Sequence, residues 1–472
     1  SEGAKIAAKE LQTYVEKISG AKLSIYSEAD PKSREGRKIL VGRSRLTDAI
    51  PGLKISEGIT PALREEGYAI VCTGDTLVLA GNDATVPKNL VDSPSPHAWE
   101  SIGTSMYFGT RYAVYDLLNR LGVRWFTPGE YGEVVPKSST VQIQEMSVTE
   151  TPDLPVRYHG AGGPDGMTEE REIWLIRNRM NPRSAEWYGF PADSSLFRYL
   201  PKDKVKDHPE WFAMLPDGTR SSGLNCMADE LRRNDPKFAG QPRMLDEMMK
   251  TVEDSVKSGR RSSAFSPDDG MPTCECDLCR KVSVRFTGGM RPDEHGSYVP
   301  EYLTGNEWFF FVNGMLDATA KKHPGHIIAT NGYANRYVPP EDIPGFNQHK
   351  NLTIMFADIN SCTIHRYDDP KCWQNRQQYN LLKRWCKLTD KVWIYGYNYT
   401  MLVSKDTVTP MVKRIRSNIP MVKDSGCLGF SDLEFIDLSQ LGIPTYVARA
   451  ALEWNTKVNV DGVLDDFYSK WF

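Results

Sequence analysis

Helical and strand-like patterns of apolar residues alternate over the first 150 residues of the chain. Between positions 5 and 19, apolar residues recur at helical spacing, and the pattern stops at Gly20. Shorter apolar runs follow, and a Gly-Asp turn after Thr73 joins two of them as a predicted hairpin. The pattern therefore predicts a small α+β domain over residues 1–150, with helices over 5–19 and 110–121 and strands over 38–42, 67–72, 76–81 and near 139–141.

From Pro155 onward, short apolar runs alternate with amphipathic stretches of helical period over about 300 residues. Repeated strand–helix alternation of this length is typical of a parallel (β/α)₈ barrel. We therefore expect an α/β protein in which such a barrel, over residues 151–472, follows the small domain. The expected strands are 156–159, 223–227, 262–266, 326–331, 351–358, 391–397 and 426–431, with an eighth near Trp187 or over 211–214. The expected helices are 169–180, 243–257, 306–322, 373–388, 407–422 and 438–454.

Composition and charge narrow the class of protein. Apolar residues make up 40% and charged residues 25% of the chain, as in an ordinary globular protein, so a disordered or disulfide-scaffold class is excluded. A net charge of −3, with both signs well mixed, gives no electrostatic footprint for nucleic acid. No apolar run is long enough to span a membrane. The 11 Trp and 21 Tyr residues favour sugar binding, because the apolar C–H faces of a pyranose stack on aromatic rings.

The chain starts at Ser1 without an initiator Met. We therefore expect a secreted or periplasmic protein from which a signal peptide has been removed. Its nine cysteines are an odd number, which in an exported protein leaves at least one unpaired thiol.

Polar residues follow the predicted barrel strands, at the end of a barrel where active sites lie. Paired carboxylates there would suit acid/base attack on a glycosidic bond. Each residue also has a structural interpretation: Asp268-Asp-Gly is a common turn, His159 could be a packed histidine, and some of the tyrosines could belong to the core. The candidate carboxylates are Asp268, Asp269, Asp358, Asp432 and Glu434, and the candidate substrate-binding residues are Arg157, His159, Asn331, Tyr333, Tyr397 and Tyr399.

Successive residues of an extended strand point in opposite directions, so only one residue of the Asp268–Asp269 pair should face a sugar. We favour Asp269, which precedes Gly270. The second carboxylate should come from Asp358, Asp432 or Glu434. No phosphate-binding Gly-rich motif, His-Glu-x-x-His or Gly-x-Ser-x-Gly is present, which argues against nucleotide enzymes, zincins and serine esterases.

Three cysteines lie within six residues, at Cys274, Cys276 and Cys279. Thiolates at this spacing can hold a zinc ion with a fourth ligand, for which Cys226 is the candidate. The alternative is a disulfide, either Cys276–Cys279 or Cys226–Cys274, in an oxidising compartment. Either arrangement would be structural; a zinc ion held by four thiolates has no open coordination position for a substrate. We expect no cofactor for catalysis.

Longer stretches carry resemblances to known families. The segment 109–130, with Gly109-Thr-Arg-Tyr and Val123-Arg-Trp-Phe-Thr-Pro-Gly-Glu, resembles the auxiliary domain that precedes the barrel in β-hexosaminidases and α-glucuronidases. Residues from about 155 to 472 resemble the domain-of-unknown-function 4838 family. The matching stretches are His208-Pro-Glu-Trp-Phe-Ala, Asn225-Cys-Met, Ser266-Pro-Asp-Asp-Gly with the cysteine triplet, Phe311-Val-Asn, Leu452-Glu-Trp-Asn, and Val458 through Asp466-Phe-Tyr.

The second resemblance implies a function. Members of that family in glycoside hydrolase family 163 cleave N-acetylglucosamine linkages in complex N-glycans, which implies a retaining endo-β-N-acetylglucosaminidase that uses the substrate's acetamide oxygen as nucleophile. Arg157 lies where hexosaminidases place an arginine that binds sugar hydroxyls. The chain departs from the family in having Asp358 and Asn360 where an acidic residue, usually Glu, is found. Two alternatives remain: a hydrolase of another polysaccharide such as a uronic-acid glycan, whose carboxylate Arg157 and Arg177-Asn-Arg could bind, and a non-catalytic glycan-binding barrel.

Overall fold

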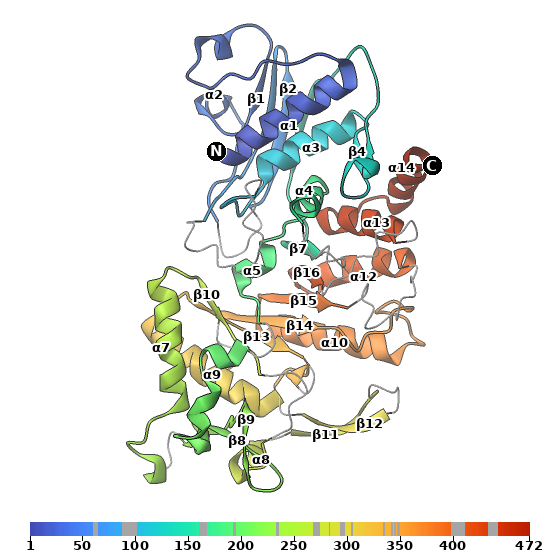
Figure 1. Cartoon of the computed structure of the whole chain (residues 1–472). Coiled ribbons are helices and arrows are strands. Elements are labelled where there is room, and N and C mark those ends of the chain that lie inside the picture. The colour runs from blue at the N-terminus through green and yellow to red at the C-terminus, as the bar shows by residue number, and fades with distance from the viewer. Residues whose placement is uncertain are drawn as a thin grey trace. The chain divides into compact units, whose positions relative to one another are not determined.

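The computed structural model describes most of the chain, and its contacts divide the chain into two compact units (Figure 1). The first unit comprises Ser1–Ser184, Asn398–Lys423 and Gly429–Phe472, and the second Ala185–Tyr397 and Asp424–Leu428. We describe each unit by itself, and the division at residue 150 stays a prediction. The described residues are 1–59, 65–86, 102–159, 168–191, 195–232, 236–267, 274–282, 284–292, 298–303, 305–333, 336–340, 343, 346, 350–397, 411–432 and 442–472.

The first unit begins with a four-stranded sheet in the order β1-β3-β2-β6. β2 and β3 form the predicted antiparallel hairpin, and β1 is parallel to β3. The last strand is not at 139–141 as predicted, because the residues that pair with β2 lie further along, from Cys72↔Met146 to Tyr68↔Glu150. The strands are β1 (Lys38–Val41), β2 (Tyr68–Thr73), β3 (Thr76–Gly81) and β6 (Met146–Glu150), and a further pair joins β4 (Arg124–Trp125) to β5 (Glu133–Val134).

Two helices, α1 (Glu2–Ser19) and α3 (Gly109–Arg120), belong to this sheet's core. Ser1 caps α1 by accepting a hydrogen bond from the Ala4 amide, and Gly20 ends it in the left-handed region at φ 78°. α3 approaches β3 so closely that a Cβ on Gly81 would lie 2.3 Å from the Gly109 carbonyl carbon. Glycine is therefore required where this helix begins on the sheet.

The rest of the first unit contains two parallel strands and several helices. β7 (Val156–His159) pairs with β16 (Gly429–Asp432), so that Arg157 lies opposite Phe430 and His159 opposite Asp432. The accompanying helices are α2 (Arg45–Asp48), α4 (Glu169–Arg177), α12 (Val412–Asp424), α13 (Ile443–Trp454) and α14 (Val460–Trp471).

The described residues of the second unit form four parallel strands in the order β10-β13-β14-β15. They coincide with four predicted runs: β10 (Ser262–Ala264), β13 (Ile327–Gly332), β14 (Leu352–Ala357) and β15 (Val392–Gly396). The long helices are α7 (Met244–Lys257), α9 (Gly305–Lys322) and α10 (Trp373–Leu388), close to their predicted ranges.

The two faces of this four-stranded sheet have different neighbours. On one face, Trp308 of α9 donates a hydrogen bond to the Thr330 hydroxyl at 3.0 Å, and a Cβ on Gly332 would lie 3.3 Å from the indole nitrogen of Trp385 in α10. On the opposite face, Gly189 lies against Ala329, whose Cβ an added side chain would approach to 2.9 Å. Side chains of alternate residues along each strand therefore meet either the helices or the segment around Gly189.

The full eight-stranded barrel is not confirmed. The described residues contain six parallel strands, four in the second unit and two in the first, within a mixed α/β fold. The run predicted over 223–227 instead forms part of β9 (Arg220–Asn225), which pairs antiparallel with β8 (Phe212–Met214), and Trp187 lies in the helix α5 (Ser184–Tyr188). The remaining elements are an antiparallel pair of β11 (Val284–Pro292) and β12 (Tyr298–Leu303) and the helices α6 (Asp229–Arg232) and α8 (Asp277–Val282).

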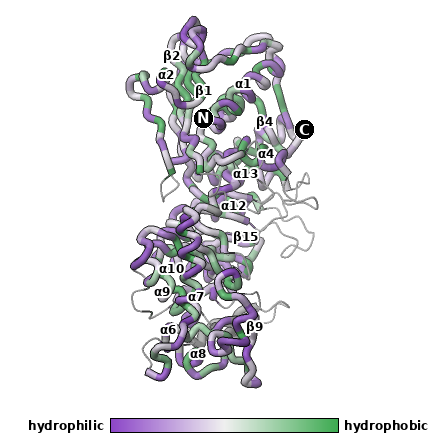
Figure 2. The backbone as a smooth tube through the Cα atoms, turned by 60° about the vertical axis from the view of Figure 1, so that its left-hand side comes forward, coloured by the Kyte–Doolittle hydropathy of each residue, from purple (hydrophilic) through white to green (hydrophobic). Residues whose placement is uncertain are grey.

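Hydrophobic and hydrophilic residues alternate along both units without a long uniform stretch (Figure 2). None of the helices among the described residues is long and apolar enough to cross a membrane.

Candidate functional site

Polar residues gather at the carboxyl edge of the four-stranded sheet in the second unit. Asn331 and Tyr333 lie at the end of β13, Asp358 follows β14, and Tyr397 follows β15. Because these strands are parallel, their carboxyl ends share one edge, and the Asp358 amide donates to the Tyr395 carbonyl at 3.2 Å. The structure thus brings together four of the residues that the sequence indicated.

Asn331 is fully buried, and neither its amide oxygen nor its amide nitrogen has a hydrogen-bond partner among the described residues. Trp393 of β15 is also fully buried, with its indole N–H unbonded within the described part of the chain. The register pairs Asn331 with Met355 and Met355 with Trp393, so these side chains project from the same face of the sheet. A buried polar atom without a partner costs about 1–3 kcal/mol, which a ligand's hydroxyl groups would offset.

Aromatic rings extend this face along β15. Phe190 stacks on Trp393 with ring centroids 5.6 Å apart, and it meets Tyr395 edge-on at 5.6 Å. Tyr395 in turn meets Tyr397 edge-on at 5.4 Å. Sequence reasoning missed Phe190 and Trp393. The signal for Trp393 was its spacing of two from Tyr395 and of four from Tyr397, which places all three on one face of a strand.

Asp358 is 1% exposed. One of its carboxylate oxygens, Oδ2, accepts hydrogen bonds from the Ser361 hydroxyl and the Tyr367 hydroxyl, both at 3.3 Å. Both donors come from the segment that follows β14. This segment therefore holds the carboxylate in place at the edge of the sheet.

Several predicted site residues lie outside the described residues. These are Asp268, Asp269, Tyr399 and Glu434. Their predicted roles as carboxylates and as a substrate-binding tyrosine stay predictions.

The first unit contains a buried ion cluster between two strands and a helix. The His159 ring lies 3.3 Å from Asp432 through Nδ1 and 2.9 Å from Glu453 through Nε2. Arg449 donates to Glu453 at 2.7 Å and also to Asp432. All four side chains are at most 3% exposed. They attach α13 to β7 and β16, so the geometry gives His159 and Asp432 a structural role beside the predicted one.

Burial opposes a charge on His159, as does the Arg449 cation. The Glu453 and Asp432 carboxylates outweigh both and raise the pKa of His159 above its usual value. Burial likewise opposes a charge on Asp432, but Arg449 and His159 lower the pKa of that carboxyl. While His159 is protonated, the cluster is two cations facing two carboxylates.

This cluster predicts a pH dependence of stability. The contribution of protonated His159 to the free energy of unfolding should be fully present below the unfolded-state pKa of about 6.5. It should be lost as the pH rises through the raised pKa of His159 in the folded state. We expect His159→Gln to lower the thermal unfolding midpoint at pH 6 and to flatten the decline on the alkaline side. The control is His208→Gln, whose ring lies 3.2 Å from the half-buried Glu210. An unchanged alkaline decline in the His159 variant would contradict this assignment.

Arg157 is fully buried and bonded within the protein. Its guanidinium donates to Glu66 at 2.7 Å and to the backbone carbonyls of Arg179 at 3.0 Å and Leu154 at 2.8 Å. Burial alone would lower the pKa of Arg157, but the Glu66 carboxylate raises it. These contacts occupy the group that the sequence predicted to bind sugar hydroxyls, so the geometry favours a structural ion pair.

Cys226 meets three cysteines of a later, short segment of the chain in the second unit. The sulfur atoms of Cys226, Cys274, Cys276 and Cys279 all lie within 4.8 Å of one another, and all four residues are buried. The Cys226 sulfur is 3.7 Å from that of Cys276 and 3.8 Å from that of Cys279. A disulfide would need about 2.05 Å, whereas four sulfurs at about 2.3 Å from a tetrahedral zinc are about 3.8 Å apart. The spacing therefore fits a zinc tetrahedron.

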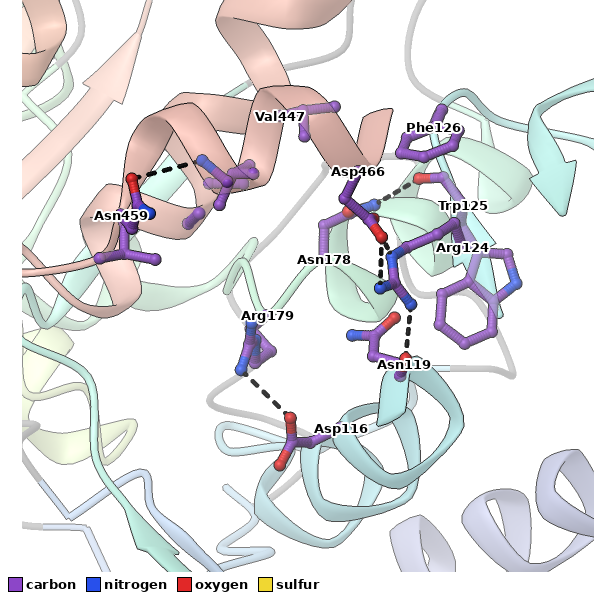
Figure 3. Close-up of a pocket in the computed structure, with 15 residues that line it drawn as sticks. Asp116, Asn119, Arg124, Trp125, Phe126, Asn178, Arg179, Val447, Asn459 and Asp466 are labelled. Carbon is purple, nitrogen blue, oxygen red and sulfur yellow. Dashed lines mark hydrogen bonds and ion pairs between the residues drawn. The ribbon is translucent and has the colours of Figure 1, made fainter. Parts of the chain in front are cut away.

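The first unit also has a polar cavity of about 490 Å³ (Figure 3). Arg124 forms a two-point ion pair with Asp466, at 2.6 and 3.0 Å, and Arg179 lies 3.8 Å from Asp116. Arg179 is held at φ 61°, a strained conformation for a non-glycine residue. These charges pair with one another, so the described residues that line the cavity offer no carboxylate pair set for catalysis.

Comparison with solved structures finds glycoside hydrolases at low identity. A family GH115 4-O-methyl-α-glucuronidase with specificity for decorated arabinogalactans is 12% identical, with a TM-score of 0.47, over 100% of this chain and 58% of that one. CpGH84B is 13% identical, with a TM-score of 0.37, over 86% of this chain and 60% of that one. A GH138 enzyme targeting pectin rhamnogalacturonan II is 11% identical, with a TM-score of 0.37, over 97% and 50%. The chain thus spans about three fifths or less of the length of these proteins.

No curated protein matches the chain. One family does: the domain of unknown function DUF4838 matches residues 127–472. The match includes β10, β13, β14 and β15 of the second unit, the four clustered cysteines and the buried ion cluster. The chain therefore belongs to the DUF4838 family.

Proposed function

We propose that this protein is a glycoside hydrolase whose sugar-binding site lies on one face of β13, β14 and β15 and reaches their carboxyl ends. The observation that carries the proposal is that two buried polar groups without a partner among the described residues, the Asn331 amide and the Trp393 indole N–H, project from the same face of the sheet. Beside them lie stacked aromatic rings, which suit the apolar faces of a pyranose. A neutral amide and an indole N–H bind hydroxyl groups.

The substrate class follows from the sequence resemblance to family 163 enzymes. We propose β-linked N-acetylglucosamine in a glycan, cleaved with retention in a secreted or periplasmic setting. The substrate's acetamide oxygen would form a bond to the anomeric carbon while the glycosidic bond breaks and a carboxylic acid protonates the leaving oxygen. Water would then attack the anomeric carbon, the bond to the acetamide oxygen would break, and the carboxylate left by the first step would take the proton of the water. Asp358 supplies one carboxylate, and the sequence offers Asp269 or Glu434 for the other.

A digestion screen tests this function. The full chain would be incubated with N-glycoproteins, an aryl β-N-acetylglucosaminide and a uronic-acid polysaccharide, and products would be identified by mass spectrometry. We expect release of glycans from the first substrate. Release from the uronic-acid polysaccharide alone would favour the second candidate class, and binding to a glycan array without turnover of any substrate would refute the enzyme proposal.

We also propose that Cys226, Cys274, Cys276 and Cys279 hold a structural zinc ion, on the strength of their tetrahedral spacing. Four thiolates would complete the coordination, so the ion would stabilise the fold and take no part in catalysis. Cys226 belongs to the segment after β9 and Cys279 to α8, so the ion would join two separate parts of the second unit.

Replacing Cys279 by Ser is expected to remove one zinc ion per chain and to lower the thermal unfolding midpoint. The control is Cys72→Ser, which alters a half-buried thiol in the first unit. Zinc content would be measured by inductively coupled plasma mass spectrometry. Equal zinc in the Cys279 variant and the wild type, or a disulfide among the four cysteines in non-reduced peptides, would contradict the zinc site.

A further inference from the structure

A second cluster of soft ligands lies in the segment between β14 and α10. The ligand atoms of Cys362, His365 and Cys372 all lie within 4.8 Å of one another, and the Cys362 sulfur is 3.1 Å from Nδ1 of His365. Cys372 is buried, Cys362 is half-buried and His365 is exposed. The cluster is therefore open to solvent on its histidine side.

The fully buried side chain of Asn375 fixes the backbone around this cluster. Its amide oxygen accepts from the Cys362 N–H at 2.7 Å, while its amide nitrogen donates to the carbonyls of Cys362 at 3.0 Å and of His365 at 2.6 Å. The Asn375 backbone N–H in turn donates to the Cys372 sulfur at 3.5 Å, where that residue caps α10. One asparagine thus holds all three ligand-bearing residues close together.

We infer that Cys362, His365 and Cys372 bind a zinc ion. Thiolate and imidazole are the ligands that zinc prefers, and three protein ligands leave a fourth position for water. Two thiols would each release a proton on binding, so the two thiolates would balance the charge of the ion. This site differs from the four-cysteine cluster, which offers sulfur alone and no open position.

The competing arrangement is a Cys362–Cys372 disulfide. A disulfide would use both sulfur atoms but not the His365 ring, which lies 3.1 Å from the Cys362 sulfur. It would also take up the Cys372 sulfur, which accepts a hydrogen bond at the start of α10. A metal ion makes use of all three side chains. The inference does not depend on the proposed function, although the same segment supplies the Ser361 and Tyr367 hydroxyls that hold Asp358.

The zinc-loaded full chain tests the inference by X-ray absorption, without any substitution. Sulfur ligands at about 2.3 Å come from either cluster, whereas an imidazole ring, with its nitrogen at about 2.0 Å and its outer ring atoms beyond, comes only from a site that contains histidine. We expect a nitrogen shell beside the sulfur shell. A spectrum with sulfur ligands alone would overturn the inference, whether or not the four-cysteine site is filled.

Substitutions of the ligand residues test whether the zinc ion binds at this cluster. His365→Ala should weaken zinc binding at least about tenfold in competition with a chelator, and Cys362→Ser should lower the zinc content by one ion per chain. The control is Cys386→Ser, a half-buried thiol outside both clusters. Unchanged zinc affinity in His365→Ala, or a Cys362–Cys372 disulfide in non-reduced peptides, would also overturn the inference. Loss of zinc with unchanged glycan cleavage would leave the inference standing and separate it from the proposed function.

Discussion

Replacing Asp358 by Asn is expected to slow cleavage of a natural glycan by roughly 10²–10⁴-fold, because the neutral amide can neither give up a proton nor carry the negative charge that the reaction needs. Asn has nearly the same shape, and its amide can still meet the Ser361 and Tyr367 hydroxyls, so the fold should be kept. The measurement is kcat/KM on the glycan and on an activated aryl glycoside.

The two substrates separate the roles of Asp358. A general acid is needed far less for an activated leaving group, so a large loss on the glycan with a small loss on the aryl glycoside would identify the proton donor. Comparable losses on both would indicate that Asp358 orients the acetamide. The control is Asp390→Asn, an exposed carboxylate just before β15, at the opposite end of that strand. Full activity of folded Asp358→Asn on both substrates would remove this residue from the site.

Replacing Glu66 by Ala is expected to destabilise the protein by about 3–5 kcal/mol, because it leaves the Arg157 cation buried without its counter-charge. Both side chains are at most 1% exposed, and the same carboxylate also accepts from Asn181 at 2.9 Å. Urea unfolding would measure the change in free energy of unfolding. Arg157→Met combined with Glu66→Leu should recover much of the loss, since an apolar pair of similar volume often replaces a buried ion pair.

The matched control for this pair is Asp75→Ala. Its partner Arg37 is 3.1 Å away, but the two side chains are 90% and 71% exposed, so the loss should stay within about 1 kcal/mol. A Glu66 variant no less stable than the Asp75 variant would contradict the buried pair. That result would favour the role of Arg157 in sugar binding that the sequence resemblance implies.

Periodicity alone predicted most helices and all six parallel strands of the described residues, because burial on one or both faces imprints a repeat on the sequence. It placed 223–227 in the barrel because a short apolar run has no feature that distinguishes a parallel strand from one in an antiparallel pair. The partner of that run, β8, is set by contacts such as Phe212↔Asn225, which the run itself does not encode.

The sequence likewise predicted some residues of the candidate site and missed others. Asn331 and Asp358 were predictable because they end apolar runs, where a parallel sheet places its chemistry. The environment of Arg157 was not, because its partner Glu66 lies 91 residues earlier in the chain. Phe190 was also missed, since only the folded chain brings its ring against Trp393. By contrast, the spacing of the cysteine triplet predicted a cluster with Cys226, and in the structure the four sulfur atoms lie together.

We propose that the amide of Asn331 binds a sugar and does not stabilise the fold. The most direct test replaces Asn331 by Leu and measures both kcat/KM on the cleaved glycan and the free energy of unfolding, with Asn351→Leu, just before β14 at its amino end, as control. We predict a loss in kcat/KM of roughly tenfold or more with stability equal to or above that of the wild type, because Leu removes buried polar atoms that have no partner in the described fold. Unchanged kcat/KM, or a loss explained by unfolding, would contradict the claim.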